Sequence, residues 1–228
     1  PSTPAPELGC ALYSDPRSTG VFWARRSDLW YSSSTFYIGG DFSTAANAAV
    51  GAGGTKSALT SGLYGTTVSG FRITSTATAE HGIRSAWQAS FVPGIRRVYC
   101  AAVQVSALSN GTDTYVLRVG AINVASNVDT TQGPWFRYSH DTNSGKWEAK
   151  CYNGTSTTTV DTGVTMASGS WFFLVIDYNY AGTQVRYWIN GTLVATITTN
   201  IPSSSLTPAM SAWLSRTAGT TSFTFDIC

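Results

Sequence analysis

The chain has 228 residues, of which 43% are hydrophobic and 13% aromatic, so a sizeable core can form and extensive disorder is excluded. Charged residues make up only 11%, against about 25% in an average soluble domain, so Ser, Thr, Asn and Gly must cover the exposed faces. The formal net charge is +2, Lys and Arg form no basic stripe, and no long apolar run occurs, so we expect neither a nucleic-acid partner nor a membrane span.

The first third of the chain has three parts of different composition. Residues 1–9 contain several prolines and little to bury, which predicts an extended N-terminal arm. Aromatic residues are dense from 11 to 42, which favours two or three short strands. Residues 43–70 are rich in Gly, Ala, Ser and Thr, and we expect a long loop, a lid or a segment that only a neighbour orders.

Beyond residue 70, short segments of β-prone residues follow at regular intervals, and no helical period is sustained. Many short strands separated by turn residues are typical of a sandwich or a barrel. The sequence therefore predicts an all-β fold, with one domain over residues 10–228. The expected strands lie at 71–75, 83–90, 97–106, 114–122, 134–140, 146–152, 156–162, 171–178, 184–189, 192–199, 210–216 and 222–227.

Two of these segments carry stronger signals. Residues 171–176 are apolar without alternation, as expected of a central strand covered on both faces or of one that crosses a thick core. Residues 185–189 and 192–197 alternate on either side of Asn190-Gly191, which predicts a hairpin. This hairpin would place Val185, Tyr187 and Ile189 on one face and Arg186 and Trp188 on the other.

Asn-Gly-Thr occurs three times, beginning at Asn110, Asn153 and Asn190. Asn-Gly is the preferred pair of a two-residue hairpin turn, because both residues adopt positive φ cheaply. The same letters form an N-glycosylation sequon, which would indicate a eukaryotic extracellular protein. We interpret all three as hairpin turns, because hairpins also account for the alternation in the flanking segments.

Catalytic and metal-binding patterns are missing from the sequence. A glycosidase motif on one strand places carboxylates two or four residues apart, and no acidic pair has that spacing here. With two histidines and four dispersed cysteines we expect no metal site and no cofactor. We therefore expect a protein without enzymatic activity.

The four cysteines are Cys10, Cys100, Cys151 and Cys228, and they allow three disulfide pairings. A bridge between Cys10 and Cys228 is attractive because terminal strands of sandwiches often lie side by side. Buried free thiols are the alternative if the chain folds in a bacterial cytosol.

Binding remains as the expected chemistry. Sugars are recognised by aromatic faces with amide, carboxylate and guanidinium groups around them, so the candidate glycan-binding residues are Trp135, Trp188, Arg186, Trp30 and Tyr31. A Trp in an alternating strand can equally belong to the core, because aromatic burial stabilises a sandwich.

An ordered series of short motifs covers more than half the chain, from residue 97 to 228. The motifs lie at residues 118–120, 133–138, 147, 169–171, 185–191, 197–202 and 226–227. Through this series, the chain resembles the concanavalin-A-like (lectin/glucanase) β-sandwich modules of bacteriophage structural proteins.

The resemblance implies a jelly roll of two curved antiparallel sheets in a virion protein on the particle surface, as a tail-fibre, head-fibre or capsid-decoration component. It implies other virion proteins as partners, and two roles are open: a fibre tip would bind a host surface glycan, whereas a decoration protein would bind capsid subunits. A homo-oligomer, for example a trimer, could pack through the aromatic-rich first 42 residues. The catalytic residues of the glucanase branch have no matching positions here. A secreted carbohydrate-binding protein and a glycoside hydrolase of the same fold are the alternative functions.

Overall fold

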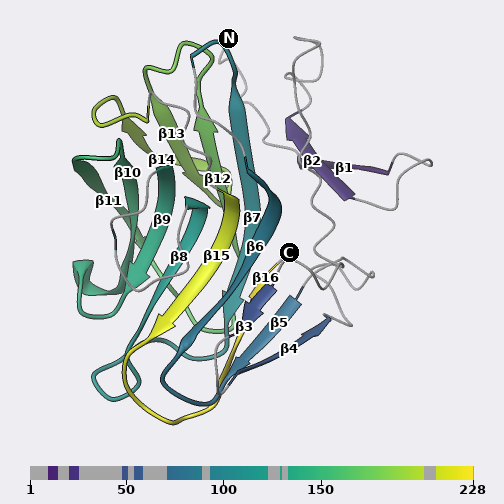
Figure 1. Cartoon of the computed structure of the whole chain (residues 1–228), viewed down its shortest axis with the longest axis vertical. Coiled ribbons are helices and arrows are strands. Elements are labelled where there is room, and N and C mark those ends of the chain that lie inside the picture. Colours follow the sequence, from purple (N-terminus) through teal and green to yellow (C-terminus); the bar gives the residue numbers. More distant parts are fainter. Residues whose placement is uncertain are drawn as a thin grey trace, which may run out of the picture.

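Two antiparallel sheets, each of seven strands, stack face to face in the computed structural model of this protein (Figure 1). The structure describes residues 10–14, 21–25, 48–50, 54–58, 71–88, 93–122, 129, 133–202 and 209–227. The first sheet holds, in spatial order, β11 (Thr157–Thr165), β10 (Lys146–Tyr152), β9 (Gly133–Ser139), β8 (Tyr115–Ile122), β15 (Ala209–Arg216), β6 (Glu80–Gln88) and β3 (Ala48–Val50). The second holds β14 (Thr192–Ile197), β13 (Val185–Ile189), β12 (Phe172–Tyr178), β7 (Arg97–Val105), β16 (Phe223–Ile227), β5 (Phe71–Ser75) and β4 (Gly54–Ala58).

The remaining described elements are short. Strands β1 (Cys10–Ser14) and β2 (Val21–Arg25) pair with each other in a separate two-stranded sheet. One turn of 3₁₀ helix, η2 (Asn143–Gly145), precedes β10. The described residues contain no α-helix, and so no helix among them is long and apolar enough to cross a membrane.

The all-β antiparallel sandwich predicted from the sequence is confirmed. Each expected strand beyond residue 70 corresponds to one strand of the structure, with ends that differ by a few residues. Alternation along the strands directs one set of side chains between the sheets, where they form one continuous core. Its centre is aromatic: Phe136 meets Tyr187 of the opposite sheet edge-on, with ring centroids 5.3 Å apart.

The expectation of a loop over residues 43–70 is wrong in two places. Strands β3 and β4 lie in that segment and pair with β6 and β5, respectively. Each is the outermost strand of its sheet, and an edge strand pairs on one side only. Gly and Ala have a low β-propensity, so the composition gave no strand signal for β3 and β4. These strands form because they pair with β6 and β5.

The hairpin predicted at Asn190-Gly191 is confirmed. Asn190 has φ 51° and Gly191 φ 81°, as a type I′ turn requires, and Ile189 pairs with Thr192. The core-facing residues are the predicted ones, Val185, Tyr187 and Ile189. The Oδ1 atom of Asn190 also accepts a hydrogen bond of 2.8 Å from the backbone N–H of Phe173, which ties the turn to β12.

The other two triplets use Asn differently. Asn153 does lie in a hairpin, between β10 and β11, but residues 153–156 form the connection and Asn153 does not have positive φ. The triplet at Asn110 is no hairpin, because it joins β7 of the second sheet to β8 of the first. In both, the Asn Oδ1 accepts hydrogen bonds from the backbone N–H groups two and three residues later, at distances between 2.8 and 2.9 Å. This side-chain turn needs no positive φ at Asn, which is why one tripeptide serves three connections.

The apolar run at 171–176 belongs to an inner strand, β12, which lies between β13 and β7. Its burial still alternates: Phe172, Leu174 and Ile176 face the core, whereas Phe173 and Val175 are half-buried on the outer face. The lack of alternation in the sequence thus reflects an outer face that is apolar as well.

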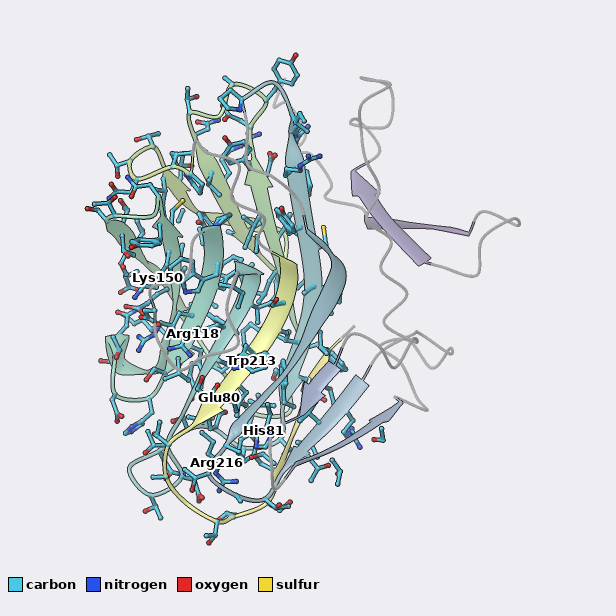
Figure 2. The ribbon with its side chains drawn as sticks, in the orientation of Figure 1. Glu80, His81, Arg118, Lys150, Trp213 and Arg216 are labelled. Carbon is cyan, nitrogen blue, oxygen red and sulfur yellow. The ribbon has the colours of Figure 1, made fainter. Side chains whose placement is uncertain are left out.

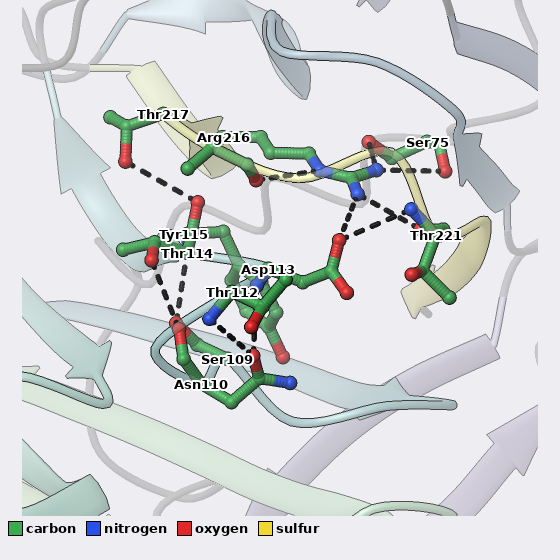
Figure 3. Close-up of polar contacts among 11 residues, drawn as sticks. Ser75, Ser109, Asn110, Thr112, Asp113, Thr114, Tyr115, Arg216, Thr217 and Thr221 are labelled. Carbon is green, nitrogen blue, oxygen red and sulfur yellow. Dashed lines mark hydrogen bonds and ion pairs between the residues drawn. The ribbon is translucent and has the colours of Figure 1, made fainter.

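One end of the sandwich is closed by Arg216, whose side chain is fully withdrawn from solvent (Figure 3). Its Nη2 donates to the Asp113 carboxylate at 2.7 Å and to the Thr221 carbonyl at 2.9 Å, and its Nη1 lies 3.3 Å from the carbonyl of Ser75. A buried cation requires such a full set of acceptors.

Several predictions lie outside the described residues: the arm at 1–9, the candidates Trp30 and Tyr31, and the disulfide between Cys10 and Cys228, because Cys228 is not among them. Cys100 and Cys151 form no disulfide. Burial raises the pKa of the Cys151 thiol to about 12, although hydrogen bonds with Tyr187 and Tyr152 act in the opposite direction.

Candidate functional site on the outer face of the first sheet

Charged side chains gather on the face of the first sheet that points away from the core. Arg118 (β8), Arg137 (β9), and Glu148 and Lys150 (β10) come from three adjacent strands. Arg118 lies directly opposite Arg137, which lies opposite Glu148. An outer sheet face is usually solvated, yet Arg118 is only 2% exposed, Glu148 7% and Lys150 9%. Such burial demands specific partners for each charge.

Asp129, which follows β8 and precedes β9 in the chain, supplies the carboxylate at the centre of the cluster. Its Oδ1 accepts a 2.9 Å hydrogen bond from Nε of Arg118. Its Oδ2 accepts one of 2.9 Å from Nζ of Lys150 and lies 3.1 Å from Nε of Arg137. Arg137 also donates to Glu148 at 2.9 Å, so three cations and two carboxylates form one network. We call the three cations Arg118, Arg137 and Lys150 the cation triad.

The network keeps Asp129 ionised. Burial alone would raise the pKa of its carboxyl group, but the hydrogen bond from Lys150 and the positive charges of Arg137, Lys150 and Arg118 outweigh burial and lower the pKa. Burial lowers the pKa of Arg118, which Asp129 partly offsets. The carboxylate and the triad therefore stabilise each other's charged forms.

Glu80 of β6 holds Arg118 from the opposite side through a serine. The Ser215 hydroxyl donates to Glu80 Oε2 at 2.6 Å and accepts a 3.0 Å bond from Nη1 of Arg118. The indole N–H of Trp213 donates to the same oxygen of Glu80. Figure 2 shows Lys150, Arg118 and Trp213 following one another diagonally across the sheet, with Glu80 below Trp213.

An aromatic group adjoins the charges. Trp213 and Trp135 cluster with Ile122, and the half-buried ring of Tyr152 packs against them. Trp213 lies on the backbone of β6 because Gly82 is its cross-strand neighbour, where any Cβ would overlap the indole ring. Trp135 is fully buried, and its indole Nε1 has no hydrogen-bond partner within the part of the chain that the structure describes. The indole Nε1 of the core residue Trp147 is in the same state, so what distinguishes the Trp135 donor is its position beside the charged cluster.

The structure separates the candidate glycan-binding residues that the sequence predicts. Trp135 belongs to the outer face of the first sheet and lies opposite Lys150. Trp188 and Arg186 lie together on the outer face of the second sheet, where the guanidinium carbon of Arg186 is 5.2 Å from the Trp188 ring centroid. Arg186 also donates to the buried Asp177 at 2.8 Å, and Arg96 donates to the same carboxylate.

Sequence reasoning missed the cation triad, Asp129, Glu148 and Glu80. The available signal was weak: Arg118, Arg137 and Lys150 each occupy a non-core position of an alternating strand, as solvent-facing charges also do. The convergence of Glu80, Asp129 and Glu148 on one face was hidden because they come from separate segments. A spacing rule along one strand cannot detect it.

These groups suit the recognition of a polar ligand. Guanidinium and ammonium groups donate to carboxylate and hydroxyl oxygens, and aromatic rings cover apolar ring faces. Among the described residues, no three His, Cys, Asp or Glu side chains gather as a metal site would require.

No protein-family model matches the chain, and no curated protein matches it. Among solved structures, it is similar to an endo-β-1,4-glucuronan lyase of the fungus Trichoderma reesei, with a TM-score of 0.52, 13% identity, and 76% of this chain and 84% of the lyase covered. It is also similar to a Bacillus licheniformis β-glucanase, with a TM-score of 0.47, 14% identity, and 76% and 88% covered. A carbohydrate esterase of the Shiga toxin-encoding bacteriophage phi24B has a TM-score of 0.48, 14% identity, and 78% and 87% covered. At these identities the likeness concerns the fold alone, which in both this chain and the glucuronan lyase is a β-sandwich.

Proposed function

We propose that this chain is a non-enzymatic glycan-binding module displayed on the surface of a bacteriophage particle, with the outer face of the first sheet as its binding surface. The observation that carries the proposal is the gathering of the cation triad beside Trp135, Trp213 and Tyr152 on that face. Polar donors next to aromatic rings are the chemistry that saccharides require.

Tyr152 is the aromatic side chain through which a saccharide would first contact this surface. Its ring is half-buried, whereas Trp135 and Trp213 are buried. The ring is fixed by a 2.8 Å hydrogen bond from its hydroxyl to the Gly154 carbonyl. A ring held in one orientation loses little entropy when a ligand stacks on it.

The state of the carboxylates supports a role without catalysis. A glycosidase needs one carboxylic acid whose pKa is raised so that it can donate a proton. The pKa of Asp129 is lowered instead, Glu148 accepts from Arg137, and Glu80 accepts from Ser215 and Trp213. Each of these carboxylates is thus already engaged by protein donors.

The proposed virion location rests on two features of the sequence. One is the motif series between residues 97 and 228, and the other is the low share of charged residues, 11% of the chain. The fold similarity to a glucuronan lyase supports a glycan as the ligand. Labelling of purified particles with an antibody against this chain tests the location. Particles that lack the chain would contradict it.

The binding function is tested on a glycan array with three variants. Tyr152→Ala removes the accessible ring and is expected to weaken binding about tenfold, since stacked aromatic contacts contribute on the order of 1 kcal/mol. Tyr180→Ala removes a ring that is 64% exposed in the loop between β12 and β13, and serves as the matched control. If Trp188→Ala abolishes binding while Tyr152→Ala does not, the binding surface lies on the second sheet instead.

The absence of catalysis is tested on the glycans that bind. Overnight incubation should release no shorter saccharide and no new reducing end. Product formation that the Glu148→Gln or Glu80→Gln variant abolishes would show that the module is an enzyme.

A further inference from the structure

We propose that Arg118, Arg137 and Lys150 form a binding site for the carboxylate of an acidic saccharide, and that the side chain of Asp129 occupies this site in the free protein. The inference rests on the proposed function and names the ligand class of that site.

The geometry around Asp129 is that of a receptor for a carboxylate. Cationic groups from three adjacent strands converge on its two oxygens: Arg118 donates a hydrogen bond to Oδ1 and Lys150 donates one to Oδ2, while Nε of Arg137 forms an ion pair with Oδ2 at 3.1 Å without a hydrogen bond. Charge-assisted contacts of this kind, between 2.9 and 3.1 Å, recognise any carboxylate, whichever molecule carries it.

The donors and the acceptor differ in how firmly they are placed. The triad residues project from the regular strands β8, β9 and β10, and Arg118 is held further by the Ser215 hydroxyl, which Glu80 orients. Asp129 lies outside these strands, and its side chain is 32% exposed, against 3% for Arg118 and 11% for Lys150. The three cations are thus fixed on the sheet, whereas the Asp129 side chain that contacts them lies on the more exposed side.

The charge balance favours an acidic ligand over a neutral one. Arg118 and Arg137 lie directly opposite each other, and like charges in that position repel. Asp129 and Glu148 contact the three cations directly and Glu80 acts on Arg118 through Ser215, so three positive charges are balanced by three negative ones only while a carboxylate occupies the Asp129 position. A neutral group in place of the Asp129 carboxylate would leave one positive charge uncompensated, whereas a ligand carboxylate would restore the present balance.

The indole N–H of Trp135 lacks an acceptor among the described residues, as does that of the core residue Trp147, but only Trp135 lies beside the triad. Trp135 is fully buried on the same face, and it pairs across strands with Lys150. A saccharide whose carboxylate contacts the triad would bring ring and hydroxyl oxygens next to this strand position. The donor that lacks an acceptor within the described structure would then gain one.

Calorimetric titration with two carboxylated probes, triglucuronate and sialyllactose, and with their neutral counterparts, cellotriose and lactose, tests the proposal. The Asp129→Asn variant removes the competing charge with little change in shape. Its affinity for at least one carboxylated probe should exceed that of the wild-type protein about tenfold, because charged hydrogen bonds contribute on the order of 1.5 kcal/mol. Neutral probes should show no such gain, and the probe that responds distinguishes a uronate from a sialate.

A double-mutant comparison adds a sharper criterion. In the Asp129→Asn background, Lys150→Gln should weaken carboxylate binding about tenfold. In the wild-type background, Lys150→Gln should weaken carboxylate binding less. There the substitution removes the Lys150 contact from the competing Asp129 carboxylate as well as from the ligand. Lys146→Gln, on the same strand but paired with the exposed Asp161, is the matched control and should change nothing in either background.

The outcomes separate this proposal from the proposed function. If Asp129→Asn leaves the affinity for both carboxylated probes unchanged or lowers it, Asp129 is a structural or ligand-contacting group and the inference is overturned. Glycan binding that is lost in Tyr152→Ala but unaffected by Asp129→Asn would sustain the proposed function alone. Thermal unfolding checks that each variant folds, and Asp129→Ser supplies a second variant without the charge.

Discussion

The fully buried guanidinium of Arg216 and the carboxylate of Asp113 are joined by a 2.7 Å ion pair that links β15 to the connection between β7 and β8 (Figure 3). The same carboxylate accepts the backbone N–H of Thr221 at 3.1 Å. The pKa of Asp113 is lowered first by a hydrogen bond from the Thr221 side chain, then by the backbone N–H of Thr221 and by Arg216, which together outweigh burial. The Arg216 side chain thereby holds together the end of β5, the connection between β7 and β8, and the connection between β15 and β16.

Loss of this cation should destabilise the whole domain. Arg216→Met keeps most of the side-chain volume but leaves Asp113 and the carbonyls of Ser75 and Thr221 without their donor. We expect the free energy of unfolding in urea to fall by about 2 kcal/mol, because each carbonyl that loses the Arg216 donor costs on the order of 1 kcal/mol. Lys146→Gln, which breaks an exposed pair, should leave it unchanged. If Arg216→Met and the wild-type protein have the same free energy of unfolding, the hydrogen bonds and the ion pair of Arg216 make no net contribution to stability.

The glycines of two Asn-Gly-Thr triplets should differ in their tolerance of alanine. Gly191 has φ 81°, where an alanine costs about 1 kcal/mol, whereas Gly111 does not have positive φ and has open space around its Cα. Gly191→Ala should therefore lower the melting temperature by several degrees for a domain of this size, and Gly111→Ala should not. The reverse order would contradict the assignment of the type I′ turn to Asn190-Gly191 alone.

The strands could be predicted because their signal is local. Alternating residues such as Val185, Tyr187 and Ile189 face the core in the structure as they do in the pattern. Strands β3 and β4 could not be predicted, because Ala- and Gly-rich edge strands form by pairing with β6 and β5. The triplet at Asn110 shows a second limit: a turn signal reveals a change of direction, but not whether the next strand stays in the same sheet.

Most residues of the candidate site could not be predicted from the sequence. Trp135 was identified for its aromatic ring, but the triad that adjoins it depends on the order β10-β9-β8 in the sheet. Asp129 reaches the triad from outside any strand, so no periodicity marks it. Cross-strand register creates this cluster, and register follows from the whole fold.

The stability contributed by Asp129 should depend on pH. Its folded-state pKa is lowered, so the stabilisation is present above the unfolded-state pKa of about 3.9 and is lost as pH falls through the folded-state value. In urea unfolding, Asp129→Asn should be less stable than the wild-type protein at pH 7, and the difference should shrink steadily below pH 4. A difference that stays constant with pH would show that the charge of Asp129 has no role in folding.

The Cys151 thiol should resist alkylation in the folded protein. It is fully buried, and a pKa raised to about 12 leaves almost no thiolate at pH 8. Iodoacetamide labelling followed by peptide mass spectrometry should detect modified Cys151 only after unfolding. The same spectra examine Asn110, Asn153 and Asn190. Hexosamine on these residues would contradict the bacteriophage proposal and support a secreted carbohydrate-binding protein.

The most direct test of the central claim is a crystal structure of the Asp129→Asn protein with triglucuronate or sialyllactose bound. The account predicts the saccharide on the outer face of the first sheet, with one carboxylate in contact with Arg118, Arg137 and Lys150 and a sugar ring against Tyr152. A saccharide bound beside Trp188 and Arg186 on the second sheet, or crystals without bound saccharide at saturating concentration, would contradict it.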